Sequence, residues 1–378
     1  MKKIILTFLI ISWSNSINAQ SFTKTVKKNN KFSFELFKEI FTKDSNSFIS
    51  PYSISSALAM TYAGAKGNTE KQMAAVLHYE LNQIKTHTGF NLLNTYFKSY
   101  ASDSSIILSI ANAIWKDENW HFNQEYLDLT NKYYQASIYP LKGAKEINTW
   151  VKKETRNKIP TIVEEGDLAN ARMVLTNAIY FKSNWRYSFK KENTKRSDFN
   201  GQPVKIMSQK GNFKYFADEH KQVIELPYQN QNISMVVILP SIENNISNLV
   251  QELNDTTCQS YLNSLTKVEV NLSLPKFKVE TTYDIDRSLK KMGMTDAFDV
   301  TRANFSGMST GLSISKIIHK SFLEVNEEGT EAAAATAVIL REKSARRSVD
   351  FKADRPFIFF LKDNESNSIL FIGAIINP

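Results

Sequence analysis

The spacing of hydrophobic positions changes from helical to strand-like about half-way along the chain. In residues 25–43 apolar side chains recur every three or four positions, which is typical of an amphipathic helix. The same spacing, or a run of small apolar residues, predicts further helices over residues 54–63, 69–77, 89–99, 147–158 and 284–292. Beyond residue 200 short, turn-bounded apolar runs dominate instead. Helices in the first half and strands in the second favour an α+β fold with several sheets.

The strands are expected wherever β-branched and aromatic residues gather between turn residues. A short strand should precede Pro51, which lies near the start of a helix. Residues 171–181 are too continuously apolar for an edge and should form a central strand. The other predicted strands are residues 106–115, 203–208, 212–217, 222–228, 232–240, 267–273, 276–281, 312–318, 322–325, 356–361 and 369–376.

One stretch, residues 325–347, carries conflicting signals. The run Ala332, Ala333, Ala334 and Ala335 is made of the best helix former, yet it leads into Val-Ile-Leu, which suits a strand. Read with period two, one face is small or apolar throughout, with Thr330, Ala332, Ala334, Thr336, Val338 and Leu340. Residues 341–348 then form a basic, polar run that a trypsin-like protease would cut if it were exposed.

Composition indicates a chain with a large core and no internal boundary. Of the 378 residues 42% are hydrophobic, and no Pro/Gly/Ser-rich linker or repeat divides them. The length would allow two or three domains, but one continuous domain over residues 20–378 is the simplest interpretation. The single cysteine, Cys258, excludes an intramolecular disulfide and is expected to be a small buried apolar residue.

The charge pattern favours a solvated basic surface. The net charge is +9, but Lys and Arg are spread along the chain and are not interleaved with aromatic residues as in a nucleic-acid groove. No specific nucleic-acid partner is therefore expected. A polyanion partner is left open, without a site.

The N-terminus has the three-part form of a secretory signal peptide. Lys2 and Lys3 precede an apolar core over residues 4–13, and small polar residues follow as far as Ala19. That core is too short to span a membrane, which needs about 20 apolar residues. We therefore expect residues 1–19 to be removed and a monomer beginning near Gln20 to be secreted without a membrane anchor, or released to the periplasm if the source is bacterial.

Candidate chemistry is sparse. Residues 307–311 match the Gly-x-Ser-x-Gly nucleophile pattern around Ser309, but a strand pattern rather than a helix follows, and His319 comes too soon with no acid between. A turn is the better prediction, and a Ser309 hydrolase is a remote alternative. The five histidines lack metal-ligand spacing, so no metal and no cofactor are expected. Six Asn-x-Ser/Thr sequons begin at Asn232, Asn245, Asn254, Asn271, Asn304 and Asn364.

Several motifs, in one order along the chain, resemble those of the serpins, the serine protease inhibitor family. The stretch Glu-Glu-Gly-Thr-Glu-Ala-Ala-Ala-Ala-Thr over residues 327–336 is similar to their reactive-loop hinge. Further matching motifs occupy residues 46–54, 175–185, 274–276, 319–320, 353–357 and 370–378. Together they span about residues 32–378, which is nearly the whole of the expected mature chain.

The resemblance implies an α+β, serpin-like fold of three β-sheets and eight or nine helices, with an exposed reactive-centre loop at about residues 327–350. It also implies an inhibitor rather than an enzyme. The target protease attacks the loop and is held as an acyl-enzyme, and the cleaved loop then inserts into the large sheet. The small face of residues 330–336 fits such an insertion, because a bulky or charged side chain would oppose it.

The family register, fourteen positions after the hinge glycine, implies a reactive bond between Lys343 and Ser344, and hence a trypsin-like target. A loop one residue shorter would place Glu342 at the bond and select a glutamyl-specific protease, and Arg341, Arg346 and Arg347 are further rivals. The implied hinge comprises Glu327, Gly329, Thr330, Glu331, Ala332, Ala333, Ala334, Ala335 and Thr336.

The resemblance also assigns structural roles within the large sheet. Ser53, Asn177 and His319 should form a polar cluster beneath the sheet at the place where it must open. Trp185 should lie at the top of that opening, where Glu327 is expected to pair with Lys276. A non-inhibitory serpin that acts as a carrier or chaperone-like binding protein is the alternative function.

Overall fold

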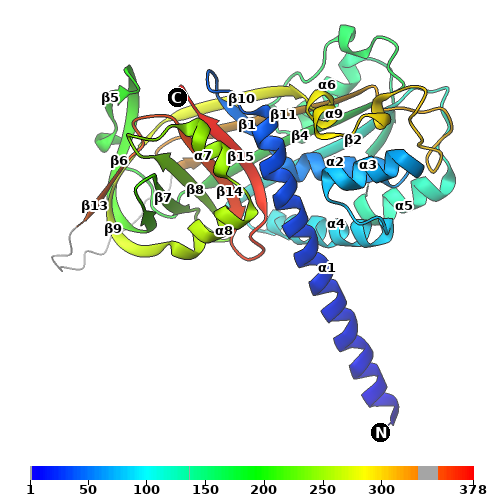
Figure 1. Ribbon diagram of the computed structural model, residues 1–378, viewed down its shortest axis with the longest axis horizontal. Coiled ribbons are helices and arrows are strands. Elements are labelled where there is room, and N and C mark those ends of the chain that lie inside the picture. Colours follow the sequence, from blue (N-terminus) through cyan, green and yellow to red (C-terminus); the bar gives the residue numbers. More distant parts are fainter. Residues whose placement is uncertain (1, 136, 331–347) are drawn as a thin grey trace.

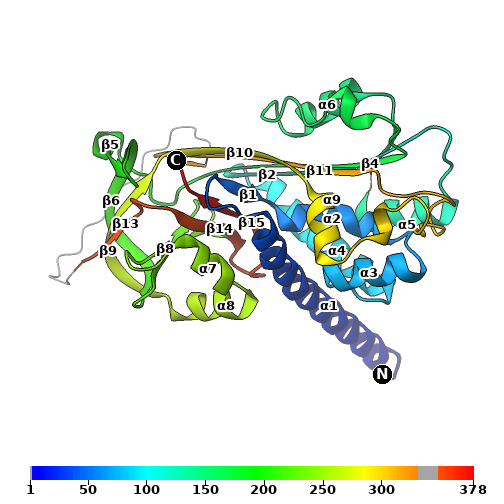
Figure 2. The same ribbon diagram turned by 45° about the horizontal axis from the view of Figure 1, so that its top comes forward.

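The computed structural model describes residues 2–135, 137–330 and 348–378. Within them most of the helices gather towards one end of the molecule, and a large twisted sheet lies towards the other with α7 and α8 beside it. The long strands β4, β10 and β11 connect the two ends (Figures 1 and 2). The described helices are α1 (Lys2–Ile40), α2 (Pro51–Tyr62), α3 (Gly67–Leu77), α4 (Gln83–Lys98), α5 (Gln124–Tyr134), α6 (Ala144–Glu154), α7 (Ile246–Glu252), α8 (Asp255–Ser264) and α9 (Ile285–Met292).

The strands form two hydrogen-bonded sheets. A nine-stranded sheet has the order β1-β15-β14-β8-β7-β6-β9-β13, with β5 paired to β6. Its members are β1 (Ser47–Ile49), β5 (Lys195–Phe199), β6 (Gln202–Ala217), β7 (Lys221–Pro227), β8 (Ile233–Pro240), β9 (Thr266–Pro275), β13 (Val349–Lys352), β14 (Phe357–Asp363) and β15 (Ile369–Ile375). A six-stranded sheet has the order β10-β11-β12-β4-β2-β3. It comprises β2 (Ile106–Lys116), β3 (Ser137–Pro140), β4 (Met173–Asn184), β10 (Phe277–Asp284), β11 (Lys316–Val325) and β12 (Gly329–Thr330).

The α+β class is confirmed, but the described strands join into two networks where three sheets were implied. The reason lies in β6, which is one strand of 16 residues where two short ones were predicted. Its N-terminal end pairs with β5, its C-terminal end pairs with β7, and β9 lies along its other edge. This single strand therefore joins what would otherwise be two separate sheets.

The helix predicted over residues 25–43 is longer than the pattern indicated, because α1 runs unbroken from Lys2 to Ile40. No Gly or Pro interrupts those residues, so nothing local ends the helix at the expected signal-peptide boundary. The N-terminal part of α1 projects away from the rest of the molecule (Figure 1). None of the helices in the described ranges has both the length and the apolar character that a membrane-crossing segment needs.

Other boundaries differ for local reasons. The helix predicted over residues 147–158 ends at Glu154, since Arg156 and Asn157 adopt left-handed backbone conformations. Residues 312–315 are not a strand, because Ile314 and Ser315 donate their backbone N–H groups to Ala297 and Met173 outside any ladder. The missed elements include α5, α7, α8, β3, β5 and β13, all of them short or rich in polar residues.

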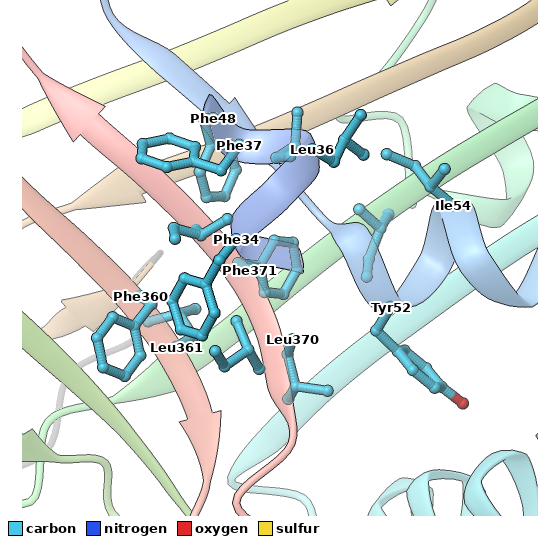
Figure 3. Close-up of a cluster of buried hydrophobic side chains, with 14 of the residues drawn as sticks. Phe34, Leu36, Phe37, Phe48, Tyr52, Ile54, Phe360, Leu361, Leu370 and Phe371 are labelled. Atoms are coloured by element: carbon cyan, nitrogen blue, oxygen red, sulfur yellow. The ribbon is translucent and has the colours of Figure 1, made fainter. Parts of the chain in front are cut away.

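The central strand was predicted correctly and the core is built around it. β4 pairs antiparallel with β2 and parallel with β11. Every residue of α2 is buried, and this helix lies against β4 on one side and β15 on the other. Aromatic side chains from α1, β1 and β15 pack beside it (Figure 3), with the rings of Phe48 and Phe371 stacked 5.3 Å apart. This packing fixes α2 directly beneath the sheet that contains the candidate site.

Candidate functional site

The chain turns back into the six-stranded sheet immediately after β11. Val325, the last residue of β11, pairs with Thr330, and Thr330 pairs on its other side with Ser183 of β4. The two residues of β12 therefore occupy the top of the space between β11 and β4. Thr330 is fully buried there, and its hydroxyl shares a hydrogen bond of 2.7 Å with the hydroxyl of Tyr228.

Gly329 is required by the close approach of β12 to β4. A Cβ at this position would lie 2.3 Å from the carbonyl oxygen of Ser183 and 2.5 Å from the Cα of Asn184. Real Cβ atoms do not approach backbone atoms so closely, so any other residue would push the turn out of the sheet. The glycine of the hinge motif thus allows the chain to enter the sheet at this point.

Trp185 anchors the turn from the end of β4. Its indole N–H donates to the carbonyl of Asn326 at 3.0 Å, and its backbone N–H donates to Glu328 at 2.9 Å. The ring stacks on Tyr228, with centroids 4.6 Å apart and planes only 10° from parallel. One aromatic pair therefore holds both the turn before Thr330 and, through the Tyr228 hydroxyl, Thr330 itself.

A nearly buried ion pair fixes the start of the turn. The Glu327 carboxylate accepts from the Lys276 ammonium at 2.7 Å and from the Thr194 hydroxyl at 2.8 Å. Burial opposes ionisation of Glu327, but these bonds outweigh it and hold its pKa below the ordinary value. The neighbouring Glu328 forms a more exposed ion pair with Lys191 at 2.8 Å. Glu327 and Lys276, which the sequence analysis expected to form a pair, thus lie together at the top of the sheet.

Below the turn the sheet is closed. β11 and β4 pair directly in parallel, from Lys316 opposite Val174 to Phe322 opposite Tyr180. Further insertion of the chain after Thr330 requires these two strands to separate.

A row of polar side chains crosses the closed part of the sheet. Asn112, Asn177 and His319 are direct register partners on β2, β4 and β11. Asn177 donates its amide hydrogens to Asn112 and to Ser53 of α2, and its Oδ1 contacts Nδ1 of His319. Ser53, Asn177 and His319 are all fully buried. The three residues of the expected polar cluster therefore touch one another directly.

The hydrogen bonds define the protonation state of His319. Its Nε2 accepts from the Ser50 N–H at 3.1 Å, so the ring proton lies on Nδ1 and is donated to Asn177. A second proton would face the Ser50 N–H without an acceptor. Burial accordingly lowers the pKa of His319 to about 3.

This burial predicts a loss of stability in mild acid. The unfolded chain protonates His319 near pH 6.5 whereas the folded protein does not until about pH 3, so the unfolded state binds more protons in between. The contribution of His319 to the free energy of unfolding is fully present above pH 6.5. Below that pH the contribution should fall by up to about 1.4 kcal/mol per pH unit. Urea unfolding between pH 7 and pH 5 measures the slope.

The variant His319→Gln separates this contribution from the others. It should be less stable at pH 7 but lose less stability towards pH 5. His87, whose pKa burial lowers to about 4, still titrates in the variant. An unchanged slope in His319→Gln would show that His319 is already protonated or solvated in the folded protein.

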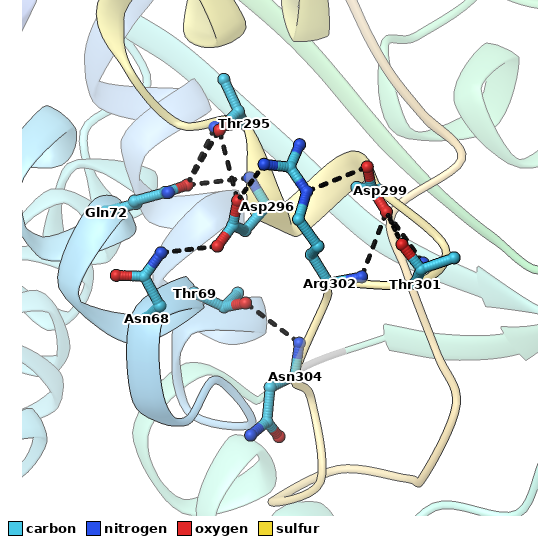
Figure 4. A network of polar contacts seen from close by, with 9 residues as sticks. All are labelled: Asn68, Thr69, Gln72, Thr295, Asp296, Asp299, Thr301, Arg302 and Asn304. Atoms are coloured by element: carbon cyan, nitrogen blue, oxygen red, sulfur yellow. Dashed lines mark hydrogen bonds and ion pairs between the residues drawn. The ribbon is translucent and has the colours of Figure 1, made fainter.

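The Ser309 hydrolase alternative finds no support in the geometry. Residues 306–311 form turns with neither a strand before nor a helix after them, and Ser309 is buried. Both ring nitrogens of His319 are engaged in the polar row. The surrounding loop is fastened to α3 by a polar network in which Asp296 accepts from Asn68 at 2.6 Å and binds Arg302 (Figure 4). The polar network therefore gives this loop a structural role.

Within the described ranges, no three His, Cys, Asp or Glu side chains gather as metal ligands would. Cys258 is buried, as its sequence context predicted, and burial raises its pKa to about 12.

The remaining hinge and reactive-bond predictions lie outside the described residues: Glu331, Ala332, Ala333, Ala334, Ala335, Thr336, Arg341, Glu342, Lys343, Ser344, Arg346 and Arg347.

Comparison with known proteins shows which family the chain belongs to. The sequence model of the family described as "Serpin (serine protease inhibitor)" matches residues 27–378. The chain belongs to the serpin family. Serpin B6 of Pongo abelii is 39% identical over 93% of this chain and 98% of its own length. The leukocyte elastase inhibitor of Sus scrofa is 40% identical over the same shares of the two chains.

A solved structure supports the same assignment. The crystal structure of the thermophilic serpin tengpin in its native state matches with a TM-score of 0.86 and 32% identity, over 93% of this chain and 94% of that one. The serpin fold predicted from the sequence motifs is therefore confirmed, and the named relatives include a protease inhibitor.

Sequence reasoning missed several residues of the site. Asn112 and Tyr228 lie at positions within or beside predicted strands that carry no special local signal. Their role depends on strand register and on a contact between separate sheets, so only the three-dimensional pairing reveals it. Thr194, Lys191 and Ser50 were missed for the same reason.

Proposed function

We propose that this serpin is a secreted, irreversible inhibitor of trypsin-like serine proteases that is cut between Lys343 and Ser344. The observation that carries the proposal is the position of Thr330, which already lies between β11 and β4. Because the next residues on the same face, from Ala332 to Thr336, are small, the strand can lengthen into the sheet without burying a charge or a bulky group.

The proposed steps follow from this geometry. The protease serine attacks the Lys343 carbonyl, the bond to Ser344 breaks, and the new amino terminus leaves while the acyl-enzyme remains. The freed loop then extends β12 downward, β11 and β4 separate, and the Asn177–His319 contact is broken. The tethered protease is carried along before water hydrolyses the ester. A closed sheet that gains a strand is a metastable starting state, and the inserted state is the stable one.

Lysine at the bond favours a protease whose specificity pocket is acidic at its base. We expect trypsin to release a C-terminal fragment that begins at Ser344, which N-terminal sequencing would identify. A first residue of Lys343 would instead assign the bond to Glu342 and a glutamyl-specific target. A start after Arg341, Arg346 or Arg347 would assign the bond to the corresponding rival.

The broader test is a panel of serine proteases scored for complexes that survive SDS. Inhibition predicts a covalent band with at least one trypsin-like protease and none with the active-site serine variant of that protease. A chain that is only cleaved by every member, and that gains no thermal stability on cleavage, would contradict inhibition and favour a non-inhibitory carrier or chaperone-like serpin.

Export follows from the N-terminal pattern of residues 1–19. Expression of the full chain in a secreting host should yield a product in the medium or periplasm that begins near Gln20. A product that keeps residues 1–19 inside the cell would overturn secretion without affecting the inhibitory proposal.

A further inference from the structure

A cavity of about 320 Å³ lies between the middle of α1 (residues 20–29), the end of α3 and the start of α4. Its volume is within the range of pockets that hold small organic ligands. Its lining includes no member of the hinge, of the aromatic pair at the top of the sheet, or of the polar row. The function proposed above therefore leaves this cavity unexplained.

The walls are apolar and contain one unsatisfied polar group. Leu77, Tyr79 and Phe90 are buried side chains that line the cavity, and Ile84 lines it while remaining 53% exposed. Asn29 also lines it and is only 2% exposed, yet neither its Nδ2 nor its Oδ1 has a hydrogen-bond partner. Buried amides are nearly always paired, because an unpaired one destabilises the fold.

The rim of the cavity is cationic. Lys24 and Lys28 both reach Glu80, with ammonium–carboxylate distances of 2.6 and 2.7 Å, and Lys85 lines the same rim as an exposed side chain. Two ammonium groups therefore bind one carboxylate, and a third lies elsewhere on the rim. His78, also in the lining, already contacts Glu35 at 2.6 Å. The excess of positive charge favours an anionic group at the mouth.

We propose that this cavity binds a small amphiphile, namely an apolar chain or ring that carries a single carboxylate. The apolar body lies against Leu77 and Phe90, and the carboxylate is bound at the rim by the lysines. This site does not depend on protease inhibition, since it is separate from the hinge.

Isothermal titration calorimetry on the full 378-residue chain tests the proposal with three probes of equal chain length: decanoate, decanol and decyltrimethylammonium. We expect one saturable site that binds decanoate about tenfold more tightly than decanol, because hydrogen bonds to a charged group are the stronger kind. Decyltrimethylammonium should bind most weakly. Equal binding of the cation and the anion, or non-saturable uptake of decanoate, would overturn the proposal.

Matched variants locate the site. Ile84→Glu places a negative charge at the mouth and should weaken decanoate binding about tenfold, whereas Ile242→Glu, at an isoleucine that is 88% exposed, should leave it unchanged. Lys85→Glu should weaken binding, and Lys145→Glu on the exposed side of α6 should not. If the two variants of each pair change the affinity for decanoate by the same factor, decanoate binds elsewhere and the cavity is not its site.

Discussion

Replacing Thr330 with arginine is expected to convert the protein from an inhibitor into a substrate. The Thr330 side chain is fully buried between Val325 and Ser183 and bonds to the Tyr228 hydroxyl. Arginine would bring an unpaired guanidinium into that space, at a cost of several kcal/mol. In the proposed mechanism insertion competes with hydrolysis of the acyl-enzyme. Each 1.4 kcal/mol of added barrier would therefore slow insertion about tenfold and favour hydrolysis.

The measurement is the ratio of SDS-stable complex to cleaved, released serpin in reactions with a protease that the wild type traps. We expect the variant to need at least about ten times more serpin per inhibited protease molecule. Glu331→Arg is the matched control, because the period-two pattern places residue 331 on the opposite face. Wild-type stoichiometry in Thr330→Arg would contradict the insertion mechanism, and an equal defect in both variants would contradict the assigned face.

The hinge shows how far local sequence patterns can be trusted. The period-two pattern placed Thr330 on the face that enters the sheet, and the structure has its side chain buried there. Gly329 is needed beside it because a Cβ at this position would lie 2.3 Å from the carbonyl oxygen of Ser183. Steric demands of this kind restrict which residue type can occupy a single position, so the residue type in the sequence indicates them directly.

Contacts between strands that are distant in the sequence cannot be predicted from the residue type at one position. The central strand β4 could be predicted because its burial on both faces makes it continuously apolar. Asn112 looked like an ordinary polar residue in β2, yet it meets Asn177 only because the two strands pair in that register. The same holds for Tyr228, whose partners Trp185 and Thr330 come from other parts of the chain.

Local propensity also failed where polar residues form regular elements. α5 and α8 have few apolar positions, and α7 is only seven residues long. The side chains of Asn245 and Asn254 cap the N-termini of α7 and α8. The long α1 is the converse case. Its helical signal continues through the expected signal peptide, because an apolar core without Gly or Pro is itself a good helix former.

Removing the amide of Asn177 is expected to destabilise the closed sheet more than any surface change. In Asn177→Ala the Asn112 and Ser53 side chains and the His319 ring all lose the partner that they share. Leaving buried polar groups unpaired costs about 1–3 kcal/mol for each group, so a total loss of about 3–5 kcal/mol is expected. Part of this loss falls on the closed state alone, because in the proposed mechanism insertion separates β4 from β11 and breaks the Asn177–His319 contact in any case, whereas Asn112 and Ser53 lie on β2 and α2 and keep Asn177 as their partner.

This asymmetry makes the prediction specific to the proposed function. Asn177→Ala should lower the midpoint of urea unfolding of the intact protein and have a smaller effect on the loop-cleaved form, in which only the bonds to Asn112 and Ser53 remain to be lost; the two forms are compared by circular dichroism in the same buffer. Asn254→Ala, which removes an exposed cap on α8, should destabilise both forms equally by about 1 kcal/mol. An equal loss in both forms for Asn177→Ala would mean that the polar row survives insertion. The row would then be a feature of the core in both states rather than part of what holds β11 and β4 together before cleavage.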